Sequence, residues 1–97
     1  MARFALARAA VGDLESIADY TAERWGARQA AAYLEALEIR LRDLAERPAS
    51  GRARDALAPG LRSFPFESHV IFYQQTEDGI VVARILHQRQ DPERHLG

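Results

Sequence analysis

Arginine, histidine and aromatic side chains recur at strand-like spacing in the C-terminal part of this chain. They are Arg62, His69, Arg84, His87 and Arg89, joined by the aromatic residues Phe64, Phe66 and Tyr73. On an exposed sheet face, such side chains would stabilise a phosphodiester transition state and exchange protons at neutral pH. They would equally bind an acidic partner segment through charge-assisted hydrogen bonds. A third interpretation is structural, with Arg84 stacked on Tyr73 or paired with a carboxylate, and the residues alone leave all three open.

Other kinds of chemistry find no matching pattern. The chain has no cysteine, which removes thiol catalysis, iron–sulfur clusters and cysteine-based zinc sites. None of its serines lies in a G-x-S-x-G motif, and it has no glycine-rich phosphate-binding motif. Its histidines lack a second histidine or a carboxylate at the spacing of a zinc site. We therefore expect neither a metal nor a cofactor.

Length and charge narrow the class of protein. The 97 residues are typical of one domain, taken as residues 1–97. The 13 basic residues, all arginine, face 14 acidic ones, for a net charge of −1. Without a basic field we expect no direct nucleic-acid binding by the chain alone. No apolar run approaches the roughly 20 residues that span a bilayer, and the N-terminal apolar stretch is too short for a signal peptide, so we expect a cytoplasmic protein that binds no membrane.

The first half of the chain predicts a short strand followed by a helical hairpin. Phe4 and Leu6 alternate with Arg3 and Ala5, as in a short half-buried strand. Apolar residues then recur with a helical period over 8–25 and again over 28–46. Gly26 separates the two helices and is expected to end the first one in a left-handed conformation. Trp25 is expected to anchor the core at the end of that helix.

The second half of the chain predicts three strands. They follow a loop over residues 48–60 and cover 61–66, 69–75 and 80–87, where β-branched and aromatic residues are frequent. Pro65 places the first of these strands at an edge or a bulge. The resulting order, β-α-α-β-β-β, predicts an α+β fold in which the helical hairpin packs on one face of a small, mostly antiparallel sheet.

The sequence also predicts the turn between the last two strands and the course of the C-terminal tail. Asp78-Gly79 is typical of a two-residue turn between the last two strands. That turn would pair Tyr73 with Arg84, Phe72 with Ile85, and Val70 with His87. The polar tail contains Pro92 and should leave the sheet, with Leu96 folding back to anchor it.

A series of short motifs along nearly the whole chain resembles one known family. In the helical half they are Asp13-Leu14-Glu15, Tyr20-Thr21, Trp25-Gly26, Gln29-Ala30 and Tyr33-Leu34. In the strand half they are Gly51-Arg52, Gly60-Leu61-Arg62-Ser63, the run from His69 to Tyr73, and Arg84-Ile85-Leu86-His87 with Arg89 and Asp91. These motifs, in this order, resemble ParE-type toxins of the RelE/ParE toxin–antitoxin superfamily.

The resemblance implies a bacterial toxin that inhibits DNA gyrase, is not an enzyme, and is neutralised by a ParD-like antitoxin. An amphipathic antitoxin helix would lie in a groove beside the sheet, and Arg52, Arg54 and Arg62 would suit an acidic segment. The C-terminal tail would contact gyrase. The residues expected to bind partners are Trp25, Arg52, Arg54, Arg62, Phe64, Phe66, His69, Arg84, His87, Arg89, Asp91 and Arg94.

Two other interpretations stay open. A RelE-like, ribosome-dependent mRNA endonuclease would use Arg62, Arg84, His87 and Arg89. Against it, Val70 follows His69 where those nucleases carry a cation, lysine is absent, and the chain is slightly acidic. The second alternative is an inert relative that serves only as a protein-binding scaffold.

Overall fold

A computed structural model describes residues 2–96, so positions 1 and 97 of the predicted domain lie outside the described range. The expected order of elements is confirmed, with two short elements added between the second helix and the next predicted strand and one short helix added at the C-terminal end. The elements are β1 (Arg3–Leu6), α1 (Arg8–Trp25), α2 (Ala27–Glu46), the 3-10 helix η1 (Pro48–Ser50), β2 (Arg52–Ala53), β3 (Leu61–Phe66), β4 (His69–Thr76), β5 (Gly79–His87) and α3 (Pro92–Leu96). Within residues 2–96, no helix has the length and apolar character needed to cross a membrane.

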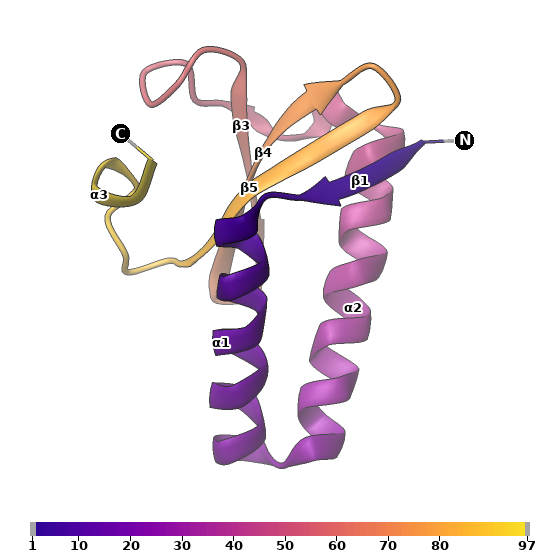
Figure 1. Ribbon diagram of the computed structural model, residues 1–97, viewed down its shortest axis with the longest axis vertical. Coiled ribbons are helices and arrows are strands. Elements are labelled where there is room, and N and C mark those ends of the chain that lie inside the picture. Colours follow the sequence, from indigo (N-terminus) through magenta and orange to yellow (C-terminus); the bar gives the residue numbers. More distant parts are fainter. Residues whose placement is uncertain (1, 97) are drawn as a thin grey trace.

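The strands form one mixed sheet in the order β1-β5-β4-β3-β2. β1 runs parallel to β5, and the other neighbours are antiparallel. The predicted α+β class is therefore confirmed. Parallel neighbours need a long connection, and the one between β1 and β5 includes both long helices. The connected end of these helices projects away from the sheet (Figure 1).

A single residue reverses the chain between α1 and α2. Gly26 has φ 93° and ψ 162°, so the predicted left-handed cap is wrong, although the positive φ still favours glycine. Because α2 begins at Ala27 and runs back along α1, Gly26 adopts an extended ψ instead of the helical ψ of a left-handed cap. The Gly26 N–H nevertheless donates to the Ala22 carbonyl at 2.9 Å and closes the last turn of α1.

Apolar side chains pack on both faces of the sheet. The larger cluster lies between the helical hairpin and the sheet, and its buried members include Ile17, Leu37, Leu41, Leu44, Ile71, Tyr73, Ile80, Val82 and Ile85. The smaller cluster, on the opposite face, consists of Leu61, Phe72 and Leu86, with Leu57, Ala58 and Leu96 against it. The packing of Leu96 confirms the prediction that it anchors the tail.

The predicted register of the β4–β5 hairpin is wrong. Thr76 pairs with Gly79, which leaves Glu77 and Asp78 in the turn, and a bulge follows at Phe72/Tyr73. The observed pairs include Tyr73 with Val82, Phe72 with Arg84, Val70 with Leu86, and His69 with His87. Gly79 belongs to the strand because it pairs with Arg3 of the parallel strand β1. The two backbones are so close that a Cβ on Gly79 would collide with the Arg3 carbonyl. That contact comes from the other end of the chain, so a local turn signal does not contain it.

The segment expected to be a loop contains η1 and the two-residue strand β2. β2 pairs with β3 only opposite Arg62 and Ser63. Among the described residues, the rest of β3 therefore has a strand neighbour on one side only. Pro65 lies in that part, which confirms its predicted position at an edge.

Candidate functional site

A groove of about 780 Å³ lies between α1, the first turns of α2, and the adjoining ends of β4 and β5. We call it the aromatic groove, and its walls include Ile17, Tyr20, Arg24 and Trp25 of α1, Tyr33 of α2, and His69 and His87 of the sheet. Its wall on α1 runs from Asp13 to Trp25, toward the connected end of the hairpin that projects beyond the sheet (Figure 1). A groove beside the sheet was expected, and the aromatic groove is in that position.

Trp25 is not a core anchor, so that prediction is wrong. It is 65% exposed, and Tyr20, one turn earlier on the same wall, is 59% exposed. Trp25 ends α1 at the projecting end of the hairpin, where the sheet no longer lies beneath the helix (Figure 1). The Arg24 guanidinium lies 5.7 Å from the centre of the Trp25 ring. Trp25 is therefore available for binding, as its place among the expected partner-binding residues requires.

Two histidines meet at the floor of the groove. His69 and His87 are directly opposite each other on β4 and β5, with ring centres 5.5 Å apart in an edge-to-face arrangement. The Tyr33 hydroxyl forms a 2.7 Å hydrogen bond with Nδ1 of His69. Tyr33 also packs edge-on against Phe66, with ring centres 5.4 Å apart. These contacts tie α2 to the start of β4.

The surroundings keep Tyr33 and His69 uncharged. Burial, and then the neighbouring His87, lower the pKa of His69, although Asp13 acts in the opposite direction. Burial, and then Glu67, raise the pKa of Tyr33. Both shifts favour the neutral forms that share the hydrogen bond at pH 7.

Arg84 has a structural partner. Its Nε and Nη2 donate to the two carboxylate oxygens of Asp13 at 2.9 and 2.8 Å, and the Ile85 N–H donates to the same carboxylate at 2.8 Å. β1 ends at Leu6 opposite Val82, so it cannot accept a hydrogen bond from the Ile85 N–H of β5. The Asp13 carboxylate of α1 accepts that hydrogen bond instead. The hydrogen bond to Asp13 raises the pKa of Arg84. Of the structural alternatives for Arg84, carboxylate pairing is thus confirmed, and its partner Asp13 was not predicted from the sequence.

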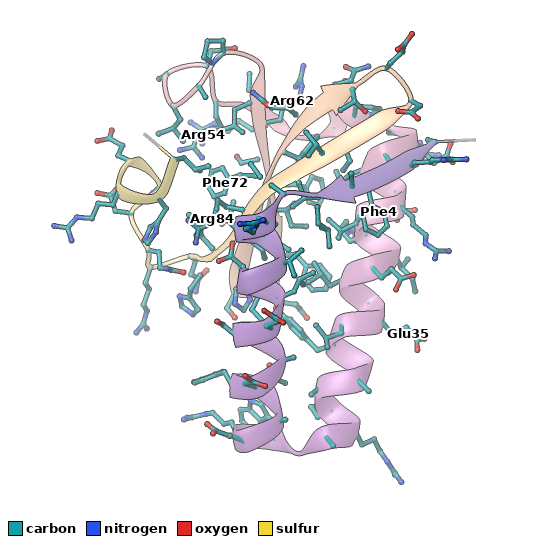
Figure 2. The ribbon with its side chains drawn as sticks, in the orientation of Figure 1. Phe4, Glu35, Arg54, Arg62, Phe72 and Arg84 are labelled. Atoms are coloured by element: carbon teal, nitrogen blue, oxygen red, sulfur yellow. The ribbon has the colours of Figure 1, made fainter. Side chains whose placement is uncertain are left out.

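The arginines expected to bind an acidic segment are largely engaged inside the chain. Arg62 donates to the Gly51 carbonyl at 2.7 Å. Arg54 donates to the Ser63 hydroxyl at 3.3 Å, and its guanidinium lies 5.6 Å from the centre of the Phe72 ring. Figure 2 shows Arg54 and Arg62 near the loop before β3, apart from Arg84 beside α1. Arg52 is the member of this set that is exposed.

The Tyr73 side chain forms hydrogen bonds with the segment between α2 and β2. Its hydroxyl donates to the Pro48 carbonyl at 2.7 Å and accepts the Gly51 N–H at 2.8 Å. Burial raises the pKa of Tyr73, although the hydrogen bond from Gly51 and the charge of Arg62 lower it. A Cβ on Gly51 would collide with the Tyr73 hydroxyl, so this close approach requires glycine. Tyr73 is completely buried and is therefore unavailable to a substrate or partner.

The expectation of one exposed sheet face carrying all these side chains is wrong. Phe64 and Phe66 pack against the larger cluster, under the helical hairpin. The Arg40 guanidinium of α2 covers the Phe64 ring at 5.2 Å. The alternation of the strands places Arg62 with Phe64 and Phe66 on one face, but the helices that cover this face are not visible in the strand sequences.

The tail leaves the sheet after His87 through local hydrogen bonds. The His87 N–H donates to the Gln90 side chain at 2.7 Å, and the Arg89 N–H donates to Nδ1 of His87 at 3.1 Å. Asp91 accepts the Glu93 N–H at 3.0 Å at the start of α3. Arg89 and Arg94 remain exposed. Of the tail residues expected to bind partners, Asp91 therefore shapes the tail while the two arginines are accessible.

The residues named for a nuclease do not gather at one place. Arg84 is bound to Asp13, and Arg62 lies opposite Tyr73, toward the end of β4 remote from His69. Residues 2–96 contain no group of three or more histidine, aspartate or glutamate side chains that could hold a metal ion. What the aromatic groove offers is apolar and aromatic surface with scattered hydrogen-bonding groups, which suits recognition of a protein segment.

Sequence reasoning missed Tyr20, Arg24, Tyr33 and Gln90 as parts of this site. Ile17, Tyr20 and Arg24 are three and four residues apart, which places them on one face of α1. This spacing was a usable signal, adjacent to the stripe that was assigned to the core.

Comparisons with known proteins agree on one family. A family model described as the ParE toxin of type II toxin-antitoxin system, parDE, matches residues 4–92. Toxin ParE1 of Mycobacterium tuberculosis H37Rv is 43% identical over 95 residues, 97% of each chain. Toxin ParE1 of Caulobacter vibrioides is 36% identical over the full length of both chains. A solved structure titled "Chromosomal ParDE TA system from P. aeruginosa" has a TM-score of 0.75 at 21% identity, over 90% of this chain and 96% of the other.

The matches cover both the helical hairpin and the sheet, so they concern the whole architecture and not one motif. The relatives are named as toxins, which supports the expectation that this chain is the toxin of a toxin–antitoxin pair. The chain belongs to the ParE toxin family of type II toxin–antitoxin systems.

Proposed function

We propose that this protein inhibits DNA gyrase in the cytoplasm and is neutralised by a ParD-like antitoxin. The observation that carries the proposal is the match of residues 4–92 to the ParE toxin family, with 43% identity to a relative named Toxin ParE1 over nearly the whole of both chains. A solved ParDE system with the same fold adds support for an antitoxin partner.

The accessible surface is compatible with two protein partners. Exposed aromatic rings such as Tyr20 and Trp25 are frequent anchors at protein interfaces. The tail presents Arg89 and Arg94 at the surface, on a segment held by Leu96. We assign the tail to the contact with gyrase, and we assign His69, His87 and Trp25 to contacts with the antitoxin. Arg52 remains a candidate contact for either partner, since it is exposed.

Two kinds of measurement test the proposed function. Controlled expression of the toxin alone should stop growth and induce the DNA damage response, and coexpression of the antitoxin gene beside it should restore growth. Purified toxin should inhibit supercoiling by gyrase and leave mRNA intact on translating ribosomes. Cleavage within the ribosomal A-site codon, without an effect on gyrase, would replace this proposal with the RelE-like nuclease.

The role of the tail needs a variant that still folds. Deletion of residues 88–97 also removes Leu96, which packs on the smaller apolar cluster. The double variant Arg89→Ala/Arg94→Ala keeps this anchor and changes exposed side chains only. We expect it to lose gyrase inhibition while its melting temperature and antitoxin binding stay unchanged. Full inhibition by the double variant would exclude these arginines from the contact with gyrase.

A further inference from the structure

The last part of β5 has no strand on one of its sides. β1 pairs with β5 only as far as Val82, and within residues 2–96 no other strand continues this side. Backbone N–H groups that point to an open side of a sheet are available to other partners. The Ile85 N–H donates to the Asp13 carboxylate, and the His87 N–H donates to the side chain of Gln90. The second of these contacts lies at the base of the tail.

Gln90 takes the place of the missing strand for one residue pair. Its N–H donates to the His87 carbonyl at 2.9 Å, and its Oε1 accepts the His87 N–H at 2.7 Å. Two residues opposite each other in an antiparallel ladder exchange the same pair of hydrogen bonds. The side-chain nitrogen of Gln90 lies 3.4 Å from Nε2 of His95 in α3. Gln90 thus connects the end of β5 to the helix of the tail.

The same contacts fix the backbone of Arg89. Its N–H donates to Nδ1 of His87 at 3.1 Å, and the hydrogen bond from Gln90 to His87 closes a four-residue turn around it. Farther along the tail, α3 stands apart from the two long helices (Figure 1), and its Leu96 packs on the smaller apolar cluster. The tail is therefore held at two points, and between them Arg89 and Arg94 are exposed. None of the ion pairs within residues 2–96 involves either arginine.

We propose that Gln90 is a positioning residue, which holds the tail in one orientation so that Arg89 and Arg94 meet a carboxylate-bearing surface of gyrase. This inference rests on the proposed function, which assigns the tail to that contact. A segment that is ordered before binding loses less conformational entropy on association and therefore binds more tightly. Guanidinium groups in fixed positions also favour paired hydrogen bonds with carboxylates. Without the Gln90 side chain, the turn keeps one of its two hydrogen bonds to the His87 backbone, and Arg89 loses its fixed direction.

Gln90→Met tests the inference, because it removes the acceptor and keeps the length of the side chain. The variant should need about tenfold more protein to inhibit gyrase supercoiling by half. Its melting temperature should stay close to that of the unmodified protein, since Gln90 is exposed. Gln75→Met, the same change at an exposed glutamine of β4, should inhibit like the unmodified protein. Gln90→Glu should restore inhibition, because a carboxylate oxygen accepts the His87 N–H.

Equal inhibition by Gln90→Met and the unmodified protein would overturn the inference and leave the proposed function intact. Equal losses in Gln90→Met and Gln90→Glu would also overturn it, because the acceptor would then not be what matters. Absence of gyrase inhibition by the unmodified protein would reject both the inference and the proposed function.

Two further measurements separate positioning from a direct contact between Gln90 and gyrase. In 15N relaxation, the amides of Arg89 and Arg94 should become mobile in Gln90→Met, and an unchanged tail would overturn the inference. Gln90→Met combined with Arg89→Ala should weaken gyrase binding by less than the product of the two separate effects, because Gln90 acts through Arg89. Effects that multiply fully would show that Gln90 acts independently of Arg89 and would overturn its positioning role.

Discussion

The two halves of the helical hairpin differ in what covers them. In the sheet-proximal half (residues 8–17 and 37–46), Ala10, Ile17, Leu37, Leu41, Leu44 and Ala45 are buried. In the distal half (residues 18–36), Ala30 is the buried hydrophobic residue, and Tyr20 and Trp25 are exposed. The helices are continuous and equally regular in both halves. The difference shows that the buried contacts of the hairpin are concentrated in the proximal half, while the distal half leaves large aromatic side chains exposed.

Leu41→Ala should give the largest loss of stability. Leu41 is 2% exposed in the larger cluster, and truncation of such a leucine leaves a cavity that typically costs 2–5 kcal/mol. Ile39→Ala is a matched control on the same helix, because Ile39 is 56% exposed. Urea unfolding of both variants checks the prediction. Similar midpoints for the two would mean that the proximal half is not the core.

Asp13→Asn should cost about 2 kcal/mol, because it removes the charge that holds Arg84 and weakens the acceptor of the Ile85 N–H. Asp13 and Arg84 are largely buried, with side chains 13% and 21% exposed, so solvent screens this pair little. Asp19→Asn, an exposed residue of the distal half, should change the free energy of unfolding by less than about 0.5 kcal/mol. Equal effects of the two substitutions in thermal melts would contradict the assigned role of Asp13.

The Tyr33–His69 contact joins the distal half to the sheet and should make stability depend on pH. Burial lowers the pKa of His69 in the folded state, so the unfolded chain binds more protons between that pKa and the ordinary value of about 6.5. The stabilisation is therefore complete above about pH 6.5 and is lost as the pH falls, by at most about 1.4 kcal/mol per pH unit. Unfolding measured from pH 7.5 to 5.5 should show a flatter profile for His69→Gln. His95→Gln, an exposed control, should keep the slope of the unmodified protein.

Trp25→Ala should have the smallest effect on stability, within about 0.5 kcal/mol, because the side chain is 65% exposed. Its effect should appear in antitoxin affinity instead. Calorimetric unfolding and binding measured on one preparation separate these two quantities. A loss of about 2 kcal/mol or more in stability, with unchanged binding, would restore Trp25 to the core and remove the contrast between the halves.

Much of the architecture was predictable from the residues. The hydrophobic period changes from two to the helical value and back, which fixed the type and order of the main elements. Their bounds agree closely, as in β3 at Leu61–Phe66 and the end of α2 at Glu46. The two-residue strand β2 was not predicted, because its pairing depends on Arg62 and Ser63 in β3 and not on its own composition.

The candidate site was predictable only in part. His69, His87 and Trp25 were named from the sequence and do line one groove. Phe64, Phe66, Arg62 and Arg84 were placed on the same exposed face. In the structure the two aromatic rings are partly buried against the larger cluster, and both arginines form hydrogen bonds within the chain. Residue types and spacing do not reveal which neighbour a long side chain finds.

By itself, the sequence determined the α+β class, the helical hairpin, the edge position of Pro65 and the chemical types available to the site, since these follow from periodicity and backbone restrictions. The tertiary structure alone decided which end of the hairpin is covered. α1 and α2 extend past the face of the sheet on which they pack (Figure 1). The apolar stripe of α1 continues to Trp25, but at that end of the helix no sheet lies opposite it, whereas Leu41 is covered. Burial depends on what lies opposite a residue, and that is a property of distant segments brought together by folding.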